Sequence, residues 1–153
     1  MMHYFMFIED KPGFHRYDIV KRIIRVLDTL YKLYNALFII SKNTDYWELI
    51  YYKPYSYLKL LTNTEGLRNI ISIILPTNRI IILSEQASLS SRILCKSRQP
   101  KCFVLGLHSD FSYDILKMLG LVIEKDVNLG NVSYITSHCI YIIYYLERLC
   151  QYK

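Results

Sequence analysis

The stretch that decides the fold of this chain is Lys101–Leu149, which begins KCFVLGLHSDF and ends VNLGNVSYITSHCIYIIYYLERL. The first part predicts a buried strand that ends in Gly106, followed by a short helix. The second part predicts a strand that ends at Leu129 and Gly130, and then a closing amphipathic helix. Ligands bind beyond the carboxyl ends of strands in open parallel sheets. The two glycine-marked strand ends therefore predict a cleft for a small ligand.

Apolar runs alternate with helical spacing along the rest of the chain, which predicts an α/β fold: a mainly parallel sheet flanked by helices. The predicted strands are His3–Ile8, Ala36–Ser41, Tyr46–Tyr52, Ile80–Leu83, Phe103–Gly106 and the end of Leu121–Leu129. The predicted helices are Ile19–Leu33, Glu65–Leu75 (capped by Asn63 or Thr64 and ended by Pro76), Ser112–Leu119 and Ile135–Leu149. No internal repeat or linker is visible, so residues 1–153 predict a single domain.

The composition indicates a folded protein with a mild basic excess. The chain is 52% hydrophobic, with 15 tyrosines but only 5 glycines and 4 prolines, which argues against disorder. The formal net charge of +6 favours anionic partners such as RNA, although charge alone does not establish a nucleic-acid binder. The abundant tyrosines reflect either base-stacking surfaces or an AT-rich genome, and the genome is the favoured explanation for most of them.

Compartment and membrane signals point to a cytoplasmic protein. The four cysteines have no CxxC spacing and lie in or beside apolar runs, so free thiols in a reducing cytoplasm are expected. Glu9 and Asp10 interrupt the apolar start of the chain, which argues against a secretory signal. The longest candidate membrane stretch, Ile135–Leu146, is too short to span a bilayer and contains His138, so no membrane partner is expected.

The predicted cleft has the chemistry of an adenine site. Glycine lets backbone N–H and C=O groups approach a ligand closely, and Leu105, Leu129, Ile135 and Ile140 supply apolar walls. The alternative is that both glycines merely turn the chain. Spacing alone leaves both possibilities open.

The order of these motifs resembles a known family. FVLGLHSDF, then VNLG about two dozen residues later, then SHCIYIIYYLERL, are similar to the cofactor-binding end of the SPOUT superfamily, closest to archaeal TrmY-type tRNA pseudouridine methyltransferases. Upstream, Arg16-Tyr17-Asp18 with Arg22 resembles the family's element at the start of its first helix, and Arg68-Asn69-Ile70 resembles an element that opens a later helix. The match covers most of the chain, and its C-terminal half is the specific part.

The resemblance implies a deep trefoil knot over about residues 79–153, a rare feature that no periodicity predicts. It implies S-adenosyl-L-methionine as cofactor, held by Leu83, Leu105, Gly106, Leu129, Gly130, Ser133, His138, Cys139 and Ile140. It also implies a homodimer that uses apolar faces of the first and last helices, for which the candidates are Ile142, Ile143, Leu146 and Leu149.

The chain departs from the family pattern in two places. Leu107 stands where the family's GDH turn has an aspartate, and the arginine-rich turn before the cofactor strand is reduced to Arg92, Lys96 and Arg98. Both departures affect the expected substrate more than the cofactor, because backbone groups hold the cofactor.

The substrate end is predicted around the start of the first helix. The resemblance makes Asp18 and Arg16 catalytic, with Asp18 accepting the proton that pseudouridine N1 loses as the methyl group arrives. Arg22 is expected to bind substrate. The alternative is an aspartate that stabilises the helix dipole beside exposed basic neighbours.

Further substrate contacts are expected from Arg68, Asn69 and His108. The alternative for Arg68 and Asn69 is that they brace the dimer, and the alternative for His108 is a partly exposed loop residue. No metal is expected at His138-Cys139, because adjacent helical residues point about 100° apart and no further ligand stands at metal spacing.

The predicted function is N1-methylation of pseudouridine in the tRNA T loop, at position 54, by an S-adenosylmethionine-dependent enzyme. Three alternatives stay open: a methyltransferase of another RNA site, an inactive knotted RNA-binding or scaffold protein, and a generic nucleotide-binding α/β protein. The last lacks any GxGxxG or GxxxxGK[ST] motif.

Overall fold

The structure is a computed structural model of the chain, and it describes residues 2–11, 17–83, 89–90, 101–107, 111–128 and 136–151. In chain order the elements are β1 (His3–Glu9), α1 (Tyr17–Leu30), β2 (Tyr34–Ser41), β3 (Tyr46–Lys53), β4 (Ser56–Asn63), α2 (Thr64–Ile74), β5 (Arg79–Leu83), β6 (Leu89–Ser90), β7 (Cys102–Gly106), α3 (Asp114–Met118), β8 (Val122–Asn128) and α4 (Thr136–Gln151).

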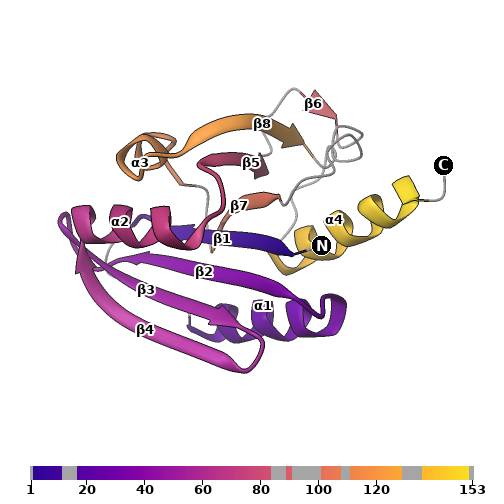
Figure 1. Cartoon of the computed structure of the whole chain (residues 1–153), viewed down its shortest axis with the longest axis horizontal. Coiled ribbons are helices and arrows are strands. Elements are labelled where there is room, and N and C mark those ends of the chain that lie inside the picture. The colour runs from indigo at the N-terminus through magenta and orange to yellow at the C-terminus, as the bar shows by residue number, and fades with distance from the viewer. Residues whose placement is uncertain are drawn as a thin grey trace.

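The strands of the described residues form one twisted sheet in the order β4-β3-β2-β1-β7-β5-β8-β6, with β4 at one edge and β8 and β6 at the other (Figure 1). The pairings β1·β2, β1·β7, β5·β7, β5·β8 and β6·β8 are parallel, whereas β2·β3 and β3·β4 are antiparallel. The predicted α/β fold with a mainly parallel sheet and flanking helices is therefore confirmed.

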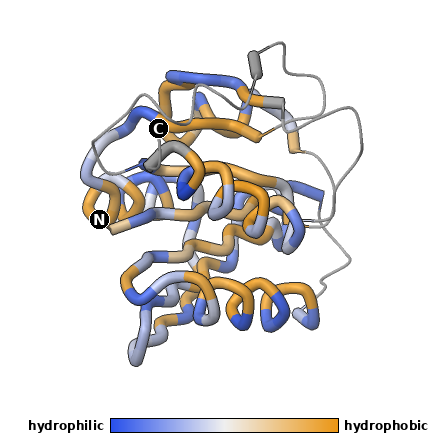
Figure 2. Tube along the Cα trace, turned by 90° about the vertical axis from the view of Figure 1, so that its right-hand side faces the viewer, coloured by the Kyte–Doolittle hydropathy of each residue, from blue (hydrophilic) through white to orange (hydrophobic). Residues whose placement is uncertain are grey.

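Side-chain alternation along the central strands divides the core between the two faces of the sheet. On β1, Phe5 and Phe7 belong to the cluster that includes α1 and α4, while Met6 and Ile8 belong to the cluster that includes α2 and α3. In Figure 2 hydrophobic residues follow the central strands, and hydrophilic residues lie on the outward turns of the helices. Both faces of the central strands are thus buried, which explains why these strands read as continuous apolar runs.

Helix α1 forms because its apolar residues share one side. Val20, Ile23, Val26 and Leu27 are buried at helical spacing, and the basic residues between them are exposed. The predicted helix was too long, however, since α1 ends at Leu30 and Leu33 is 60% exposed.

Helix α2 begins as its sequence predicts. The Asn63 side chain accepts a hydrogen bond from the Gly66 N–H at 2.8 Å, which caps the helix. The helix ends at Ile74, shortly before Pro76, which cannot continue it.

Strand β4 was not predicted, and its turn explains why. Pro54 and Tyr55 form a two-residue connection between the paired residues Lys53 and Ser56, and Tyr55 has a φ of 68°. Glycine or asparagine usually occupies such a position. Because a tyrosine stands there, the turn lacks the glycine or asparagine that usually follows a turn proline such as Pro54.

The knot stays a prediction. Its threading depends on residues 84–88, 91–100 and 129–135, which lie outside the described residues. The described part does place α4 beside α1, on the same face of the sheet.

Candidate functional site

The predicted ligand edge is formed by the carboxyl ends of β7, β5 and β8. These strands run parallel and lie side by side, so their ends meet at one edge of the sheet. Leu83 and Leu105 are both buried there, and Gly106 is partly exposed. The described part of this edge therefore consists of two buried apolar side chains and one partly exposed glycine.

Thr136 ties the start of α4 to this edge. Its hydroxyl donates a hydrogen bond of 2.6 Å to the Gly106 carbonyl oxygen and lies 3.4 Å from that of Leu107. The predicted cleft therefore has β7 and the first turn of α4 in direct contact. Thr136 was missed from the sequence, because the partner carbonyl lies 30 residues away.

Leu107 continues the strand pairing and points into the core. Its N–H donates to the Ile8 carbonyl oxygen at 2.9 Å, and its side chain is buried in the cluster between the sheet and the helices α1 and α4. A carboxylate in this position would lose its hydration. The departure from the family's aspartate thus replaces a polar group with a core residue.

The first turn of α4 presents three different environments. His138 is exposed, Cys139 packs partly buried against the core cluster, and Ile140 is completely buried in it. Within the described residues no group of three or more His, Cys, Asp or Glu side chains is arranged to hold a metal ion.

The start of α1 lies beyond the carboxyl end of β1, the strand next to β7. Asp18 and Arg22 are both exposed on the first turns of this helix. Their spacing of four residues places them on neighbouring positions of one helix side. The predicted catalytic Asp18 and the predicted substrate-binding Arg22 are therefore neighbours on one exposed side of α1, and their roles stay predictions.

Two buried carboxylates near this place were missed from the sequence. Glu9 ends β1 and is 5% exposed, and Glu48 on β3 is 4% exposed. Ile40 of β2 pairs with both residues, so all three lie in one row across the sheet, on the face that carries α1. The only signal in the sequence was an acidic residue within an apolar strand.

The other end of α4 is held by a buried ionic cluster. Both carboxylate oxygens of Glu147 lie 3.1 Å from His3 Nε2, and one lies 3.3 Å from Lys101 Nζ. Burial by itself would raise the pKa of Glu147, but the His3 hydrogen bond and the charges of His3 and Lys101 lower it below its usual range. This cluster attaches α4 to β1 and to the residue before β7.

The comparisons identify the fold. No family model and no curated protein matches the chain. Among solved structures, the chain is similar to Nep1 from Archaeoglobus fulgidus bound to S-adenosylhomocysteine, with a TM-score of 0.65 and 14% identity over 100% of both chains. The chain has the SPOUT fold. At this identity the likeness establishes the fold and leaves the activity to be proposed.

Within the SPOUT fold, Arg68 and Asn69 lie away from the other predicted substrate residues. Both are exposed on α2, which covers the sheet face opposite α1 and α4. Arg68 lies beside Gly120, at the turn before β8. Its Nε atom would be 3.2 Å from a Cβ atom added to that glycine. Their contact with substrate stays a prediction that the described geometry does not support.

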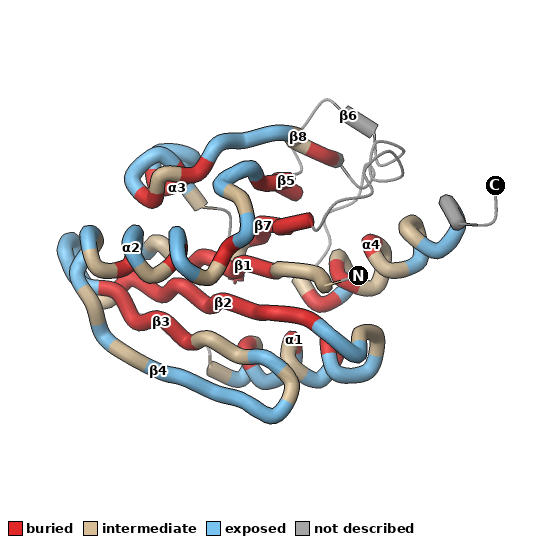
Figure 3. The backbone as a smooth tube through the Cα atoms, viewed as in Figure 1, coloured by how far each residue is buried: buried red, intermediate tan, exposed pale blue. Residues whose placement is uncertain are grey.

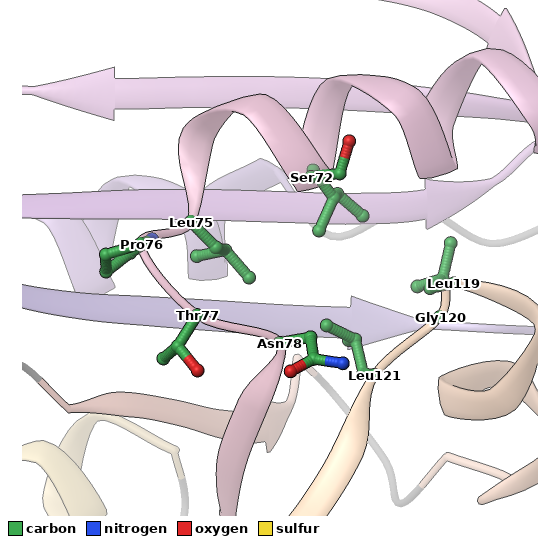
Figure 4. Close-up of a pocket in the computed structure, with 9 residues that line it drawn as sticks. Ser72, Leu75, Pro76, Thr77, Asn78, Leu119, Gly120 and Leu121 are labelled. Atoms are coloured by element: carbon green, nitrogen blue, oxygen red, sulfur yellow. The ribbon is translucent and has the colours of Figure 1, made fainter.

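A hollow near the same turn is separate from the ligand edge. It lies between the end of α2, the following residues up to Asn78, and the turn at Gly120 (Figure 4). These residues precede β5 and β8, so the hollow is at the amino-terminal ends of the strands.

Several residues that the sequence predicts for the site lie outside the described residues. They are Arg16, His108, Leu129, Gly130 and Ser133, together with the basic residues Arg92, Lys96 and Arg98. Their roles stay predictions.

Proposed function

We propose that this chain is an S-adenosyl-L-methionine-dependent RNA methyltransferase. The observation that carries the proposal is the full-length likeness to a protein solved with S-adenosylhomocysteine, the demethylated form of that cofactor. At the proposed site, β5 and β7 end in the buried Leu83 and Leu105 and in the partly exposed Gly106. No described helix is long and apolar enough to cross a membrane.

The cofactor would bind at the carboxyl edge, against Leu83, Leu105 and Gly106, with Cys139 from α4 beside it. Ile140 is completely buried, so it would support this wall from within the core. Leu129, Gly130, Ser133 and His138 complete the proposed set. Cys139 is packed against apolar side chains, so it offers a small apolar surface.

The bound cofactor supplies an electrophilic methyl group, and the chain positions the nucleophile and takes up its proton. For pseudouridine N1 in the tRNA T loop, Asp18 is the proposed proton acceptor, with Arg16, Arg22 and His108 around the base. Glu9 is a second candidate acceptor, because its carboxylate is buried at the end of β1, next to β7. Asp18 is favoured because it is exposed to an incoming RNA.

We also propose a cytoplasmic homodimer built on the outer side of α4. Tyr145 and Leu149 are 58% and 61% exposed there, and the end of α4 projects away from the sheet (Figure 1). Leu146 is partly buried against the chain's own core, and Ile142 is partly exposed. The expectation for Ile143 was wrong, because this residue is completely buried inside the chain and has no surface to offer a partner.

The test is incubation with labelled S-adenosylmethionine and total unmodified tRNA, followed by nucleoside analysis. N1-methylpseudouridine would support the proposal, and a different methylated nucleoside would move it to another RNA site. The buried Leu107 favours one alternative, an RNA-binding protein without activity. Calorimetry separates the two: absence of cofactor binding at millimolar concentration would favour the inactive protein.

A further inference from the structure

A mixed ionic and aromatic cluster lies beside the start of α1. Glu48 Oε2 is 3.1 Å from Lys42 Nζ and accepts a hydrogen bond of 3.1 Å from the Tyr17 hydroxyl, while Glu48 Oε1 is 3.7 Å from Lys59 Nζ. Lys42 also donates to the Tyr17 hydroxyl at 3.0 Å. Both ammonium groups lie over the Tyr17 ring, at 5.7 and 5.2 Å from its centre.

The cluster has more positive charge than its own carboxylate neutralises. Glu48 contributes one negative charge and is only 5% exposed, whereas the side chains of Lys42 and Lys59 are 28% and 47% exposed. The Lys59 contact is longer than a hydrogen bond, and Glu48 Oε1 has no hydrogen-bond partner despite being buried. The two lysines therefore carry one more charge than Glu48 alone balances, and Lys59 is the more exposed and less tightly held of the two.

Lys42 keeps its charge at neutral pH. The hydrogen bond to Tyr17 and, more weakly, the Glu48 carboxylate raise the pKa of Lys42 above its usual value, despite the opposing effect of burial.

Exposed aromatic and apolar side chains continue this charged surface along the edge of the sheet. The register places Tyr57, Lys59 and Leu61 on the same face of β4, opposite Tyr52, Ile50 and Glu48 of β3. Tyr57 is 60% exposed and Leu61 is 68% exposed. Most of β4 is exposed along the free edge of the sheet in Figure 3. We call this face of β3 and β4, with Lys42, the hairpin face.

We propose that the hairpin face binds RNA, with Lys42 and Lys59 holding a phosphate group and Tyr57 stacking on an unpaired base. This inference rests on the proposed function and extends it, since Tyr17 begins α1 and is next to Asp18. Lysines interleaved with exposed aromatic rings are the combination that binds single-stranded nucleic acid. The excess charge of the chain matches the same partner.

The test uses the full chain, a fluorescent unmodified tRNA transcript and the variants Lys59→Ala and Tyr57→Ala. Phosphate contacts carry no sequence information, so the tRNA transcript is a valid probe even if the enzyme methylates a different RNA site. The control is Lys53→Ala, because Lys53 is exposed on the opposite face of the same hairpin. Calorimetry with S-adenosylmethionine is run on every variant.

We expect Tyr57→Ala to weaken RNA binding about fivefold or more. Lys59→Ala should reduce the slope of log affinity against log salt concentration by about 0.7. Lys53→Ala should stay within about twofold of the wild type, and cofactor affinity should not change in any variant.

Two results would overturn the hairpin face while leaving the proposed function intact: normal RNA binding by both variants, or an equal loss with Lys53→Ala. Lys59→Ala and Tyr57→Ala are also tested for binding to phosphatidylserine vesicles. If these variants lose vesicle binding but keep RNA binding, the hairpin face is overturned as well. If the wild type neither binds the cofactor nor transfers a methyl group to the RNA, the proposed function fails. An RNA affinity that still depended on Lys59 and Tyr57 would support the hairpin face independently.

Discussion

Replacing Glu147 by glutamine should destabilise the chain strongly, because the change removes the negative charge that pairs with the buried Lys101 and hydrogen-bonds His3. The Lys101 side chain is 7% exposed and that of Glu147 is 17% exposed. Removing one partner of a buried ion pair costs about 3–5 kcal/mol. Glutamine keeps the shape of the side chain and one hydrogen-bond acceptor, and part of the site is hydrated. We therefore expect a loss of about 2–3 kcal/mol of unfolding free energy.

The assay is urea unfolding at neutral pH, supported by thermal unfolding. A loss of this size corresponds to a decrease in Tm of roughly 4–12 °C for a chain of this length. The control is Glu124→Gln, which removes an equal charge from an exposed position on β8 and should change stability by less than about 0.5 kcal/mol.

The pH dependence gives a second, sharper measurement. The pKa of Glu147 is lowered in the folded chain, so its contribution is fully present above the unfolded value of about 4.3 and disappears as the pH falls through the folded pKa. The stability difference between the wild type and Glu147→Gln should therefore shrink in acid below that value. A difference that is under about 0.5 kcal/mol at neutral pH, or that does not change in acid, would refute the ionic role of the cluster.

Three further changes test the ligand edge and the substrate end. Thr136→Val removes the hydroxyl that donates to the Gly106 carbonyl oxygen, and it should lower the unfolding free energy measured in urea by about 1–2 kcal/mol. The exposed control Thr29→Val should lower it by less than about 0.5 kcal/mol. Equal losses would contradict a stabilising contact between α4 and β7. Gly106→Val should weaken cofactor binding about tenfold in calorimetry, or about 1.4 kcal/mol, while the dimer still forms; unchanged affinity would remove Gly106 from the site. Asp18→Asn should lower turnover about 100-fold with little change in cofactor affinity; if Glu9→Gln alone does so, Glu9 is the proton acceptor.

Elements with strong local patterns were predictable from the sequence. The helices α1, α2 and α4 follow their apolar spacing, and the Asn63 cap marks the start of α2. Strand β4 was not predictable, because Tyr55 adopts a positive φ at a turn that normally carries glycine. The hairpin is instead held by the pairing of β4 with β3, which local sequence preferences do not reveal.

The site divides in the same way. Gly106 and the start of α4 could be predicted as neighbours, because both are marked by local sequence and by the family resemblance. The row of Glu9, Ile40 and Glu48 could not, because it depends on the register of three strands. A shift of one residue would turn these side chains to the other face.

The sequence by itself determined the alternation of strands and helices, the mainly parallel sheet and the glycine at the end of β7. Apolar periodicity and turn residues act over a few neighbouring positions, so they are readable along the chain. Only the tertiary structure decided that Thr136 holds the Gly106 carbonyl, that Leu107 is a core residue and that Lys59 joins Glu48 beside Tyr17. These contacts join residues far apart in the chain, and strand order and register, rather than local preference, bring them together.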